Sequence, residues 1–585
     1  MLKQQHKLLL ETVFLGVVGA LAAQVFTFLL RWCQYFFLAW LADYRPPGMT
    51  GVAGARPLIT GAHTLWLIPV ATTFGGLLAG LLVYTMAPEA EGHGTDAAVN
   101  AFHNLRGVIR TRVPFIKMIA SAITIGSGGS AGREGPTALI AAGIGSVYAR
   151  KRRYSEEETR LLLLVGMAAG LSAIFRSPIG TAIFAVEVLY SETDFESGAL
   201  VFTMLGSIVA YAVNGLFVGF RPLFEVPAKL PPLRAVDYCW YIVLGIACGV
   251  VATILPMALY GVRDLFHMIP CPPHFKPAIA GLAVGLVAMA LPQVLGGGYG
   301  WIQAAINGQI AMALLLVLAV AKIVTFSLTI GSGGSGGVFA PSLFTGAMIG
   351  GFLSPILHQP PAAFAVVGMA AVFGAAARVP IATLLMVTEM TGGYDLLAAA
   401  ALAVTLASLL QTLLSASLKY KSLYEAQVPS RPYSPAHYVE DVRIALELLK
   451  TPALSKVLDK RGLELLSIVS SGVPVSLAEG KQIRIGALKP KSPCVGQPIG
   501  AGCLKGQEEV ELILVLRGNR ALWPHSDLRL EAGDRLVAVA SEPAWSSLSD
   551  HLVKLGAPPP HKVTPGAPPY ELTHESHSPD RPSAP

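Results

Sequence analysis

The chain has 585 residues, of which 53% are hydrophobic and 14% are charged, and its mean hydropathy is +0.57. A typical soluble domain carries about 25% charged residues, so this composition excludes a soluble enzyme of this length. The formal net charge is +7. No long basic run with interleaved aromatic residues accompanies it, which argues against a nucleic-acid partner. Basic loops of a membrane protein explain the charge.

The N-terminal segment predicts an uncleaved membrane helix. Lys3 and Lys7 precede an apolar run that extends nearly to Leu41, which is longer than the hydrophobic region of a signal peptide. By the positive-inside rule, the basic end of this helix lies in the cytoplasm. We therefore expect a multi-pass protein of a bacterial inner membrane.

Apolar runs of about 20 residues, the length that spans a bilayer, recur up to residue 418. Between Asp264 and Glu389 there is no acidic residue, so this stretch cannot be a water-facing domain. The runs are continuous rather than alternating, which favours helices over barrel strands. Examples of the expected spans are 9–30, 64–87, 161–190, 197–219, 239–260, 309–330 and 395–418.

The membrane region contains an internal repeat. Residues 126–136 read GSGGSAGREGP and residues 331–341 read GSGGSGGVFAP, with 7 of 11 positions identical. Two more blocks match in the same order at nearly the same offset, namely 88–94 with 292–298 and 166–187 with 368–389. We expect two homologous repeats, 1–220 and 221–425, which is typical of transport proteins with a site between the repeats.

The two glycine runs are the candidate site. Each breaks an apolar stretch and leads into a new helix near Pro136 or Pro341, and a helix N-terminus offers free N–H groups that bind anions. Arg133 and Glu134 are ionisable groups at membrane depth, which are functional by default. A pure packing role for the small residues stays open. A dinucleotide site is disfavoured, because no acidic residue follows 331–336 at the required distance.

At this point the chain resembles the CLC family of chloride channels and chloride/proton antiporters. The motifs that carry the resemblance are GREGP at 132–136, GGVFAP at 336–341 and the late Leu423-Tyr424 pair. The resemblance implies an all-α polytopic membrane protein with two inverted repeats and broken helices. It also implies a homodimer in the lipid bilayer, with a separate pore in each subunit.

The resemblance further implies roles for individual residues. Glu134 is similar to the gating glutamate, which occupies the anion pathway when ionised, although an ion pair with Arg133 is an alternative. Tyr424 resembles the tyrosine whose hydroxyl binds chloride, although an ordinary interfacial tyrosine stays open. The other anion-binding positions are Val338, Phe339 and Gly337, and the other residues of the pore-helix motif are Gly132, Arg133, Gly135 and Pro136.

The first motif departs from the family pattern. The family usually has Gly-Ser-Gly-Ile-Pro, whereas residues 92–96 read Gly-His-Gly-Thr-Asp. His93 therefore replaces the serine that binds the anion, and it adds acid-dependent affinity if its pKa is near neutral; a merely packed histidine stays open. Nitrate transport remains an alternative for this reason. Fluoride-specific relatives tend to lack the gating glutamate, so Glu134 argues against fluoride.

A second departure concerns proton coupling. Val188 stands where proton-coupled members often carry a glutamate as internal proton acceptor, which favours a voltage- or pH-gated chloride channel. Chloride/proton antiport is the alternative. We expect no enzyme, because no metal-ligand cluster, nucleophile–base pair or nucleotide motif occurs. We also expect no cofactor, with chloride as the transported ligand. The repeat-related Glu187 and Glu389 are expected to be structural.

After Tyr424 the composition becomes that of a soluble region. We expect a linker over 426–483 with a helix at about 437–450, and a proline-rich disordered tail over 553–585. Residues 484–552 resemble the C-terminal subdomain of bacterial potassium-transport regulators (TrkA-C, of the RCK proteins), with strands at 510–516 and 535–540. This implies a small cytoplasmic α/β domain that binds a small-molecule regulator or dimerises. The six cysteines are expected to be packing thiols.

Overall fold

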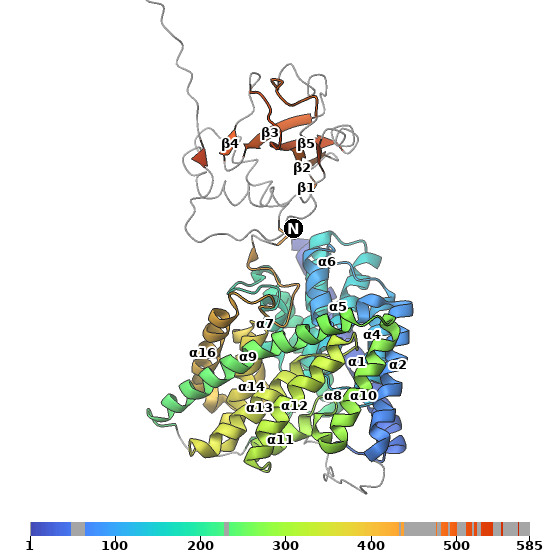
Figure 1. Ribbon diagram of the computed structural model, residues 1–585, viewed down its shortest axis with the longest axis vertical. Coiled ribbons are helices and arrows are strands. Elements are labelled where there is room, and N and C mark those ends of the chain that lie inside the picture. The colour runs from blue at the N-terminus through green and yellow to red at the C-terminus, as the bar shows by residue number, and fades with distance from the viewer. Residues whose placement is uncertain are drawn as a thin grey trace, which may run out of the picture. The chain divides into compact units, whose positions relative to one another are not determined.

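The computed structural model divides the chain into two compact units, Met1–Arg431 and Pro432–Pro585, which are treated separately below. The first unit is helical and the second contains a β-sheet (Figure 1). The residues that the structure describes are 2–47, 65–226, 233–431, 434–437, 475–476, 481–489, 492–499, 510–517, 520–522, 528–541, 552–553 and 571–572.

The helices of the first unit follow the repeat. The first repeat contains α1 Leu2–Gln34, η1 Tyr35–Leu41, η2 Leu65–Leu67, α2 Ile68–Met86, η3 Pro88–Ala90, α3 Thr95–His103, α4 Arg112–Gly126, α5 Glu134–Lys151, α6 Glu156–Phe175, α7 Pro178–Glu187, η4 Ser197–Ala199 and α8 Leu200–Val218. The second repeat contains α9 Asp237–Met268, η5 Pro273–Phe275, α10 Lys276–Ala290, η6 Pro292–Val294, α11 Tyr299–Ile306, α12 Met312–Gly331, α13 Phe339–Ile356, α14 Pro361–Ala376, α15 Pro380–Thr391, η7 Tyr394–Leu396 and α16 Leu397–Ser415.

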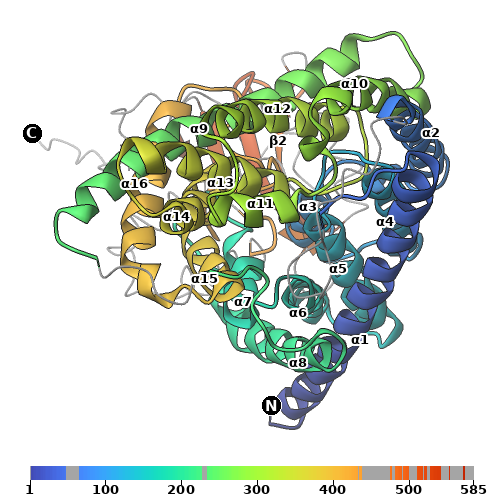
Figure 2. The same ribbon diagram turned by 90° about the horizontal axis from the view of Figure 1, so that it is seen from below.

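Except for η1, every element of the first repeat has a counterpart in the second, in the same order. Counterparts also pack on each other across the repeats, as α2 does on α10 and α7 on α15. Figure 2 shows α1 along one edge of this unit and α16 on the opposite side. A short antiparallel bridge joins Gly132 to Gly337, as expected where two inverted repeats meet. The predicted inverted-repeat architecture is confirmed.

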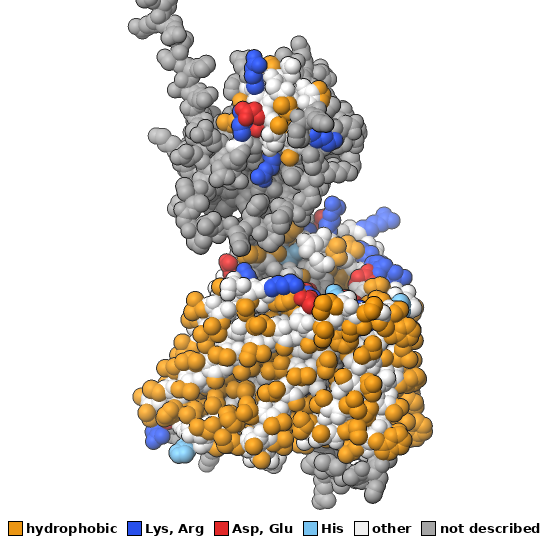
Figure 3. Space-filling view, viewed as in Figure 1, with side chains coloured by type: hydrophobic (Ala, Val, Ile, Leu, Met, Phe, Trp, Pro, Cys, Tyr) orange, Lys and Arg blue, Asp and Glu red, His pale blue; other side chains and the backbone are white. Residues whose placement is uncertain are grey.

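The surface of the first unit suits a lipid environment. Among the described residues, nine helices are long and apolar enough to cross a membrane. Hydrophobic side chains cover most of the face seen in Figure 3, and charged side chains gather along one rim. Leu216 is 81% exposed and Leu413 is 74% exposed. Soluble monomers rarely expose apolar patches on this scale, so this unit is a multi-pass membrane domain.

The expected span 161–190 is not a single helix. The apolar run 161–190 forms two helices, α6 and α7, rather than one. The chain turns at Arg176, which has a left-handed backbone with φ of 56°, and Pro178 disfavours helical geometry in the residue before it. Arg378 has the same φ of 56° between α14 and α15, so the break is part of the repeat. Pro273–Ala290 and Phe339–Ile356 add spans that the expected examples did not include.

The second unit contains one seven-stranded sheet. Its strands are β1 Val475–Ser476, β2 Lys481–Leu488, β3 Val510–Arg517, β4 Arg520–Leu522, β5 Arg535–Ser541, β6 Leu552–Val553 and β7 Glu571–Leu572. They lie in the order β1-β2-β5-β3-β4-β7, and β6 also pairs with β2. The pairs β2–β5 and β3–β5 are antiparallel, with Ile483 opposite Val539 and Leu516 opposite Arg535.

Both predicted strands of this unit are confirmed, as β3 and β5. The expected helix at about 437–450 lies outside the described residues except for its first position. The tail that was expected to be wholly disordered contains β7, which pairs with β4 in parallel. Cys494 also differs from expectation, since it is disulfide-bonded. Other described cysteines are free thiols, namely Cys33, Cys239, Cys248 and Cys271.

A small apolar core and the ion pairs of Arg517 with Asp534 and Glu531 hold this sheet together. Val515, Leu536 and Ala538 are buried at its centre. The Arg517 guanidinium donates to both carboxylate oxygens of Asp534, each at 2.9 Å. This hydrogen-bonded pairing raises the pKa of Arg517. Gly533 takes a φ of +88° in the turn before β5, a conformation that glycine adopts without strain.

Candidate functional site

The two glycine runs meet at the centre of the membrane unit. The Gly132 amide donates to the Gly337 carbonyl and the Gly337 amide donates to the Gly132 carbonyl, both at 2.7 Å. This pairing brings the start of α5 and the start of α13 together. Since the amide hydrogen of Gly337 is used in this way, it is not a free donor for an anion. Gly337 therefore supports the site, which corrects its expected role in anion binding.

Glu134 is the first residue of α5 and lies inside this junction. Its side chain is 1% exposed, and neither carboxylate oxygen has a hydrogen-bond partner among the described residues. The backbone amides of Glu134 itself and of Ala340 lie near the carboxylate. They belong to the first turns of two different helices, whose N-termini favour negative charge. The carboxylate thus occupies a place suited to an anion.

A small cavity borders Glu134. Its volume is 10 Å³, about the space of one water molecule. Val338 is the N-cap residue of α13 and Phe339 is its first residue, and the first amides of a helix have no intrahelical acceptor. The lining residues are Thr95, Glu134, Gly135, Leu171, Phe175, Phe184, Val338, Phe339 and Tyr424. The structure therefore brings five predicted site residues to one cavity, namely Glu134, Gly135, Val338, Phe339 and Tyr424.

Aromatic packing fixes the start of α13. The Phe339 ring lies 4.3 Å from the Phe175 ring and 4.2 Å from the Phe373 ring, centroid to centroid. Phe175 ends α6 and Phe373 lies on α14. One contact partner thus comes from each repeat, so the position of these amides depends on both repeats being folded.

Tyr424 is held in place by contacts around it. The Tyr260 hydroxyl donates to the carbonyl of Leu423 at 2.7 Å, and the Leu423 amide donates to Ala376 at 2.9 Å. Tyr424 itself is 2% exposed and lines the small cavity together with Thr95. An ordinary interfacial tyrosine would be exposed at the membrane surface, so the buried location agrees with a role in the pathway.

His93 lies next to the site, and its surroundings lower its pKa. Its ring centroid is 5.4 Å from that of Tyr424, and its Nδ1 atom is buried without a hydrogen-bond partner. Burial, together with the positive charges of Lys117 and Arg263, lowers the pKa of His93 to about 3. This shift away from neutrality disfavours the expected acid-dependent affinity, which stays a prediction.

The remaining residues of the pore-helix motif shape the junction. The Arg133 guanidinium carbon lies 5.4 Å from the centroid of the Tyr299 ring on α11, while the Glu134 oxygens have no partner, so a tight ion pair between Arg133 and Glu134 is not formed. Gly135 allows a close approach, because a Cβ atom there would lie 2.0 Å from the His93 carbonyl oxygen. Pro136 is in the first turn of α5, where its missing N–H costs nothing.

Val188 does not line the small cavity beside Glu134. Its side chain is fully buried, and its carbonyl accepts from Gln427 at 3.1 Å. The neighbouring Glu187 accepts from the amides of Ile381 and Ala382 at the start of α15. Glu389 accepts in the same way from the start of α7. Each repeat therefore caps a helix of the other, which is a structural role.

Sequence reasoning missed one pair of buried lysines that hold backbone near the site, Lys117 and Lys322. The Lys117 ammonium donates to the carbonyls of Ala90 and Gly92, at 3.0 and 2.7 Å. The Lys322 ammonium donates to the carbonyls of Val294 and Gly296, at 2.8 and 2.6 Å. These carbonyls belong to the weakest of the three matching blocks. The signal was present, since the two lysines are 205 residues apart, the same offset as the glycine runs.

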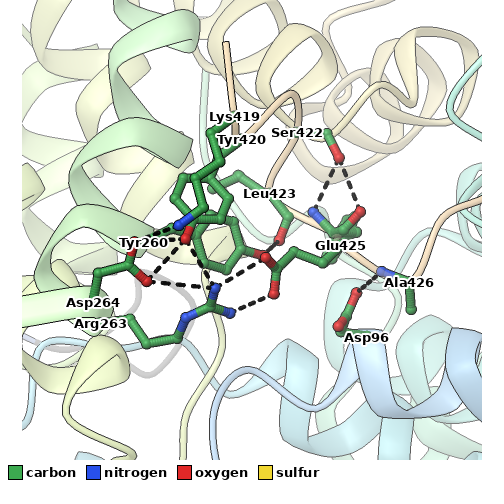
Figure 4. A network of polar contacts seen from close by, with 11 residues as sticks. Asp96, Tyr260, Arg263, Asp264, Lys419, Tyr420, Ser422, Leu423, Glu425 and Ala426 are labelled. Atoms are coloured by element: carbon green, nitrogen blue, oxygen red, sulfur yellow. Dashed lines mark hydrogen bonds and ion pairs between the residues drawn. The ribbon is translucent and has the colours of Figure 1, made fainter. Parts of the chain in front are cut away.

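A second, larger cavity of 820 Å³ adjoins the site. Its wall includes His93, Asp96, Arg263 and Glu425. Arg263 on α9 forms an ion pair with Glu425, and Asp96 accepts from the Ala426 amide at 2.8 Å. Figure 4 shows Arg263 and Glu425 in one polar network with Tyr260, Asp264, Lys419 and Tyr420, and Asp96 beside it, bonded to Ala426. The network anchors the segment that carries Tyr424.

The motifs and their geometry agree with the comparisons to known proteins. Residues 75–412 match the family model described as voltage gated chloride channel. The chain belongs to the CLC family. Residues 487–552 match the TrkA-C domain. The exchange transporter named H(+)/Cl(-) exchange transporter ClcA from Salmonella agona is 31% identical over 402 residues, covering 66% of this chain and 82% of that protein. A ClcB-like chloride channel protein from Ralstonia nicotianae is 30% identical, covering 65% and 88%.

Solved structures show the same fold. A slow cyanobacterial Cl−/H+ antiporter aligns with a TM-score of 0.62 at 22% identity, covering 71% of this chain and 96% of that one. A CLC-type fluoride/proton antiporter aligns with a TM-score of 0.62 at 23% identity, covering 74% and 100%. Together with the family match, they make this chain a CLC anion transporter with a C-terminal TrkA-C domain.

Proposed function

We propose that this protein exchanges chloride for protons across the membrane. The observation that carries the proposal is the Glu134 carboxylate, which is buried without a partner between two helix N-termini. Relatives at 31% identity are named H+/Cl− exchange transporters, which favours exchange over the channel that Val188 alone suggested. Glu134 couples the movement of the two ions, because one carboxylate both competes with chloride and binds a proton.

The exchange follows from competition at the helix ends. Isolated charge in hydrocarbon is very costly, so an anion at membrane depth needs donors such as the first amides of α5 and α13. The ionised Glu134 occupies this place itself. When it takes up a proton it loses its attraction for the amides, and chloride replaces it. Neutral donors hold the anion weakly enough to release it, which conduction requires.

Chloride is the proposed anion, although His93 replaces the usual serine. The Nδ1 atom of the imidazole has no hydrogen-bond partner among the residues that the structure describes, so it offers one polar atom beside Tyr424 in place of a hydroxyl. Nitrate is the alternative anion that the transport test must distinguish from chloride, because a changed donor at this position alters the fit of a larger anion. Fluoride is disfavoured by the presence of Glu134.

The test uses purified protein in liposomes with a chloride gradient, a potassium ionophore that clamps the voltage, and a pH electrode outside. We expect wild-type protein to move protons against their gradient. Glu134→Gln should abolish proton movement, by at least tenfold, and retain chloride flux. Glu157→Gln, an exposed glutamate at the start of α6, is the matched control and should change neither flux. Chloride flux without proton movement in the wild type would establish a channel instead.

We propose that the face bearing the large cavity is cytoplasmic. Basic residues of its loops pair with acidic neighbours there, as Arg110 does with Glu89 and Lys419 with Asp264. An excess of such residues is typical of the cytoplasmic side, here of a bacterial inner membrane. The disulfide at Cys494 is an argument against a cytoplasmic second unit, because reducing compartments rarely hold disulfides. Labelling of single introduced cysteines in intact cells tests the orientation.

We also propose a homodimer with a regulatory second unit. Large apolar side chains project from corresponding helices of both repeats, Ile179 on α7 and Ile381 on α15, which are 44% and 41% exposed. Paired subunits would cover such surfaces. The TrkA-C domain supports binding of a small-molecule regulator or dimerisation of this unit. Light scattering of purified protein measures the subunit number, and deletion of residues 484–552 tests regulation of the flux.

A further inference from the structure

Exchange requires a route by which protons reach Glu134 from the side of the large cavity. Val188 provides none, because its side chain is apolar and fully buried. If the proposed exchange is correct, a carboxylate elsewhere must carry protons towards Glu134. The inference therefore rests on the proposed exchange. Among the described residues, two carboxylates on the wall of the large cavity follow a residue that lines the small cavity, namely Asp96 after Thr95 and Glu425 after Tyr424. Glu425 is engaged by Arg263, which leaves Asp96 as the candidate.

Asp96 lies in the first turn of α3, on the wall of the 820 Å³ cavity. Its Oδ1 atom accepts from the Ala426 amide at 2.8 Å, which fixes the carboxylate against the segment that carries Tyr424. Its Oδ2 atom has no hydrogen bond to another described residue. Figure 4 shows Asp96 separate from the Arg263–Glu425 pair, bonded only to Ala426. One oxygen thus positions the group while the other stays available to water.

The preceding residue connects this carboxylate to the buried site. Thr95 lines the 10 Å³ cavity together with Tyr424 and Glu134. Thr95 and Tyr424 therefore border the same small space as the Glu134 carboxylate. Hydroxyl groups and single water molecules pass protons along hydrogen bonds. Asp96, Thr95, Tyr424 and Glu134 therefore form a series of polar groups from the large cavity to the small one.

We propose that Asp96 is the internal proton acceptor of this transporter, in place of a glutamate at position 188. It takes a proton from a hydronium ion in the large cavity, which leaves a water molecule. It passes that proton through water and the hydroxyls of Thr95 and Tyr424 to the Glu134 carboxylate. Asp96 is then ionised again, and Glu134 carries the proton until it releases it to water on the opposite side. Charge and protons balance at each transfer.

The other titratable groups on the cavity wall are less suited to this role. Glu425 is engaged by Arg263 through hydrogen bonds to both of its oxygens. His93 stays neutral at working pH, since its pKa is about 3. Glu91 is exposed and does not adjoin the small cavity. The charged side chains that act on Asp96 are Glu425, which opposes its ionisation, and Arg263, which favours it.

The acidity of Asp96 agrees with the geometry. Burial is the largest cause that raises its pKa, to about 6, and the residue lies in a short helix outside the nine spans. A carboxyl group with this pKa is about one tenth protonated at pH 7, whereas an exposed aspartate is almost never protonated there. Proton uptake at Asp96 therefore becomes frequent within the physiological range.

The experiment measures chloride and proton fluxes of the full chain in liposomes. We expect Asp96→Asn to retain chloride flux and to lose proton movement by at least tenfold. Glu91→Gln removes another carboxylate from the same cavity wall and should leave both fluxes unchanged. Asp96→Asn that moves protons as fast as wild type would overturn the proposal. If wild-type protein moves no protons at all, the exchange function itself fails, which this assay reports separately.

If Asp96→Asn loses all transport, a second variant still tests the proposal. Asp96→Glu keeps a carboxyl group at this position on a longer side chain. We record its proton flux against the pH on the cavity side, between pH 5 and 8, beside that of the wild type, whose midpoint we expect near pH 6. A midpoint that differs between the two proteins supports Asp96 as the titrating group. An identical midpoint shows that another group accepts the proton and overturns the proposal.

Discussion

The two repeats of the membrane unit share a framework but differ in chemistry at their facing helix ends. In the first repeat α5 begins after a glycine run, and in the second repeat α13 does. In each repeat a buried lysine holds the loop that precedes this run. The first repeat places Arg133 and Glu134 at this junction, whereas the second places Val338 and Phe339. One helix start therefore contributes a titratable side chain, while the other contributes backbone amides and an apolar wall.

This difference shows how a duplicated fold acquires one site rather than two. Symmetric interactions, such as the lysine contacts and the exchanged glutamate caps, hold backbone in place and recur in both halves. The ionisable groups of the proposed site occur once. His93, Asp96 and Glu134 have no ionisable counterparts in the second repeat, where Gly297, Gly300 and Phe339 occupy the corresponding places at offsets of 204 or 205.

The lysine pair provides the largest test of this comparison. Lys322→Met should destabilise the protein by about 3 kcal/mol, because two buried carbonyls lose the only donor recorded for them in the described part of the chain. Lys117→Met should cost only about 1 kcal/mol, since Gly92 still accepts from the Gly336 amide and Ala90 from the Ser335 hydroxyl. Thermal unfolding of the detergent-purified protein measures both.

The same two variants should differ in chloride flux in the order opposite to their loss of stability. The loop held by Lys117 carries His93 and leads into Thr95, so Lys117→Met should slow chloride flux several-fold. The loop held by Lys322 carries no group that faces the cavity beside Glu134, so the folded fraction of Lys322→Met should transport normally. Equal losses of stability and transport in both variants would show that the repeats are functionally equivalent, contrary to the comparison.

The exchanged caps provide a smaller test. Glu389 accepts from the Ser177 hydroxyl and from two amides at the start of α7, whereas Glu187 accepts from two amides at the start of α15. Glu389→Ala should therefore cost about 2 kcal/mol and Glu187→Ala about 1 kcal/mol, from the loss of capping and dipole interactions. Unfolding midpoints measured side by side check the order, and the reverse order would contradict it.

The smallest expected effect concerns His93. Because burial lowers its pKa to about 3, the imidazole is neutral from pH 5 to 8 and carries no charge to lose. His93→Asn should leave the midpoint of the pH dependence of chloride flux unmoved, even if the rate changes. Liposome flux recorded at several pH values tests this. A midpoint that moves by more than half a pH unit would show that His93 titrates in the working range.

Much of the architecture was predictable from particular residues. The matching glycine runs indicated two repeats, and the proline after each run indicated where α5 and α13 begin. The absence of acidic residues between Asp264 and Glu389 placed that stretch in lipid. In the second unit, alternating residues predicted β3 and β5. These features are local or periodic, so they can be recognised without knowing which segments meet in space.

Other features depended on contacts between distant segments. Gly337 resembles an anion-binding position by motif, but its amide bonds to Gly132, 205 residues away. The left-handed Arg176 divides a run that hydropathy treats as one helix. The role of Asp96 also escaped the sequence, because Thr95 and Asp96 meet Tyr424 and Ala426 only when the end of the membrane unit folds back against α3.

By itself the sequence determined the membrane class, the duplication and the identity of Glu134 as the one acidic group in the glycine motifs, because composition and repeats do not depend on tertiary contacts. Only the tertiary structure decided which amides are free, that burial lowers the pKa of His93 and that Asp96 faces the large cavity. These properties arise from burial and from hydrogen bonds between the repeats, and both exist only when the two halves have packed together.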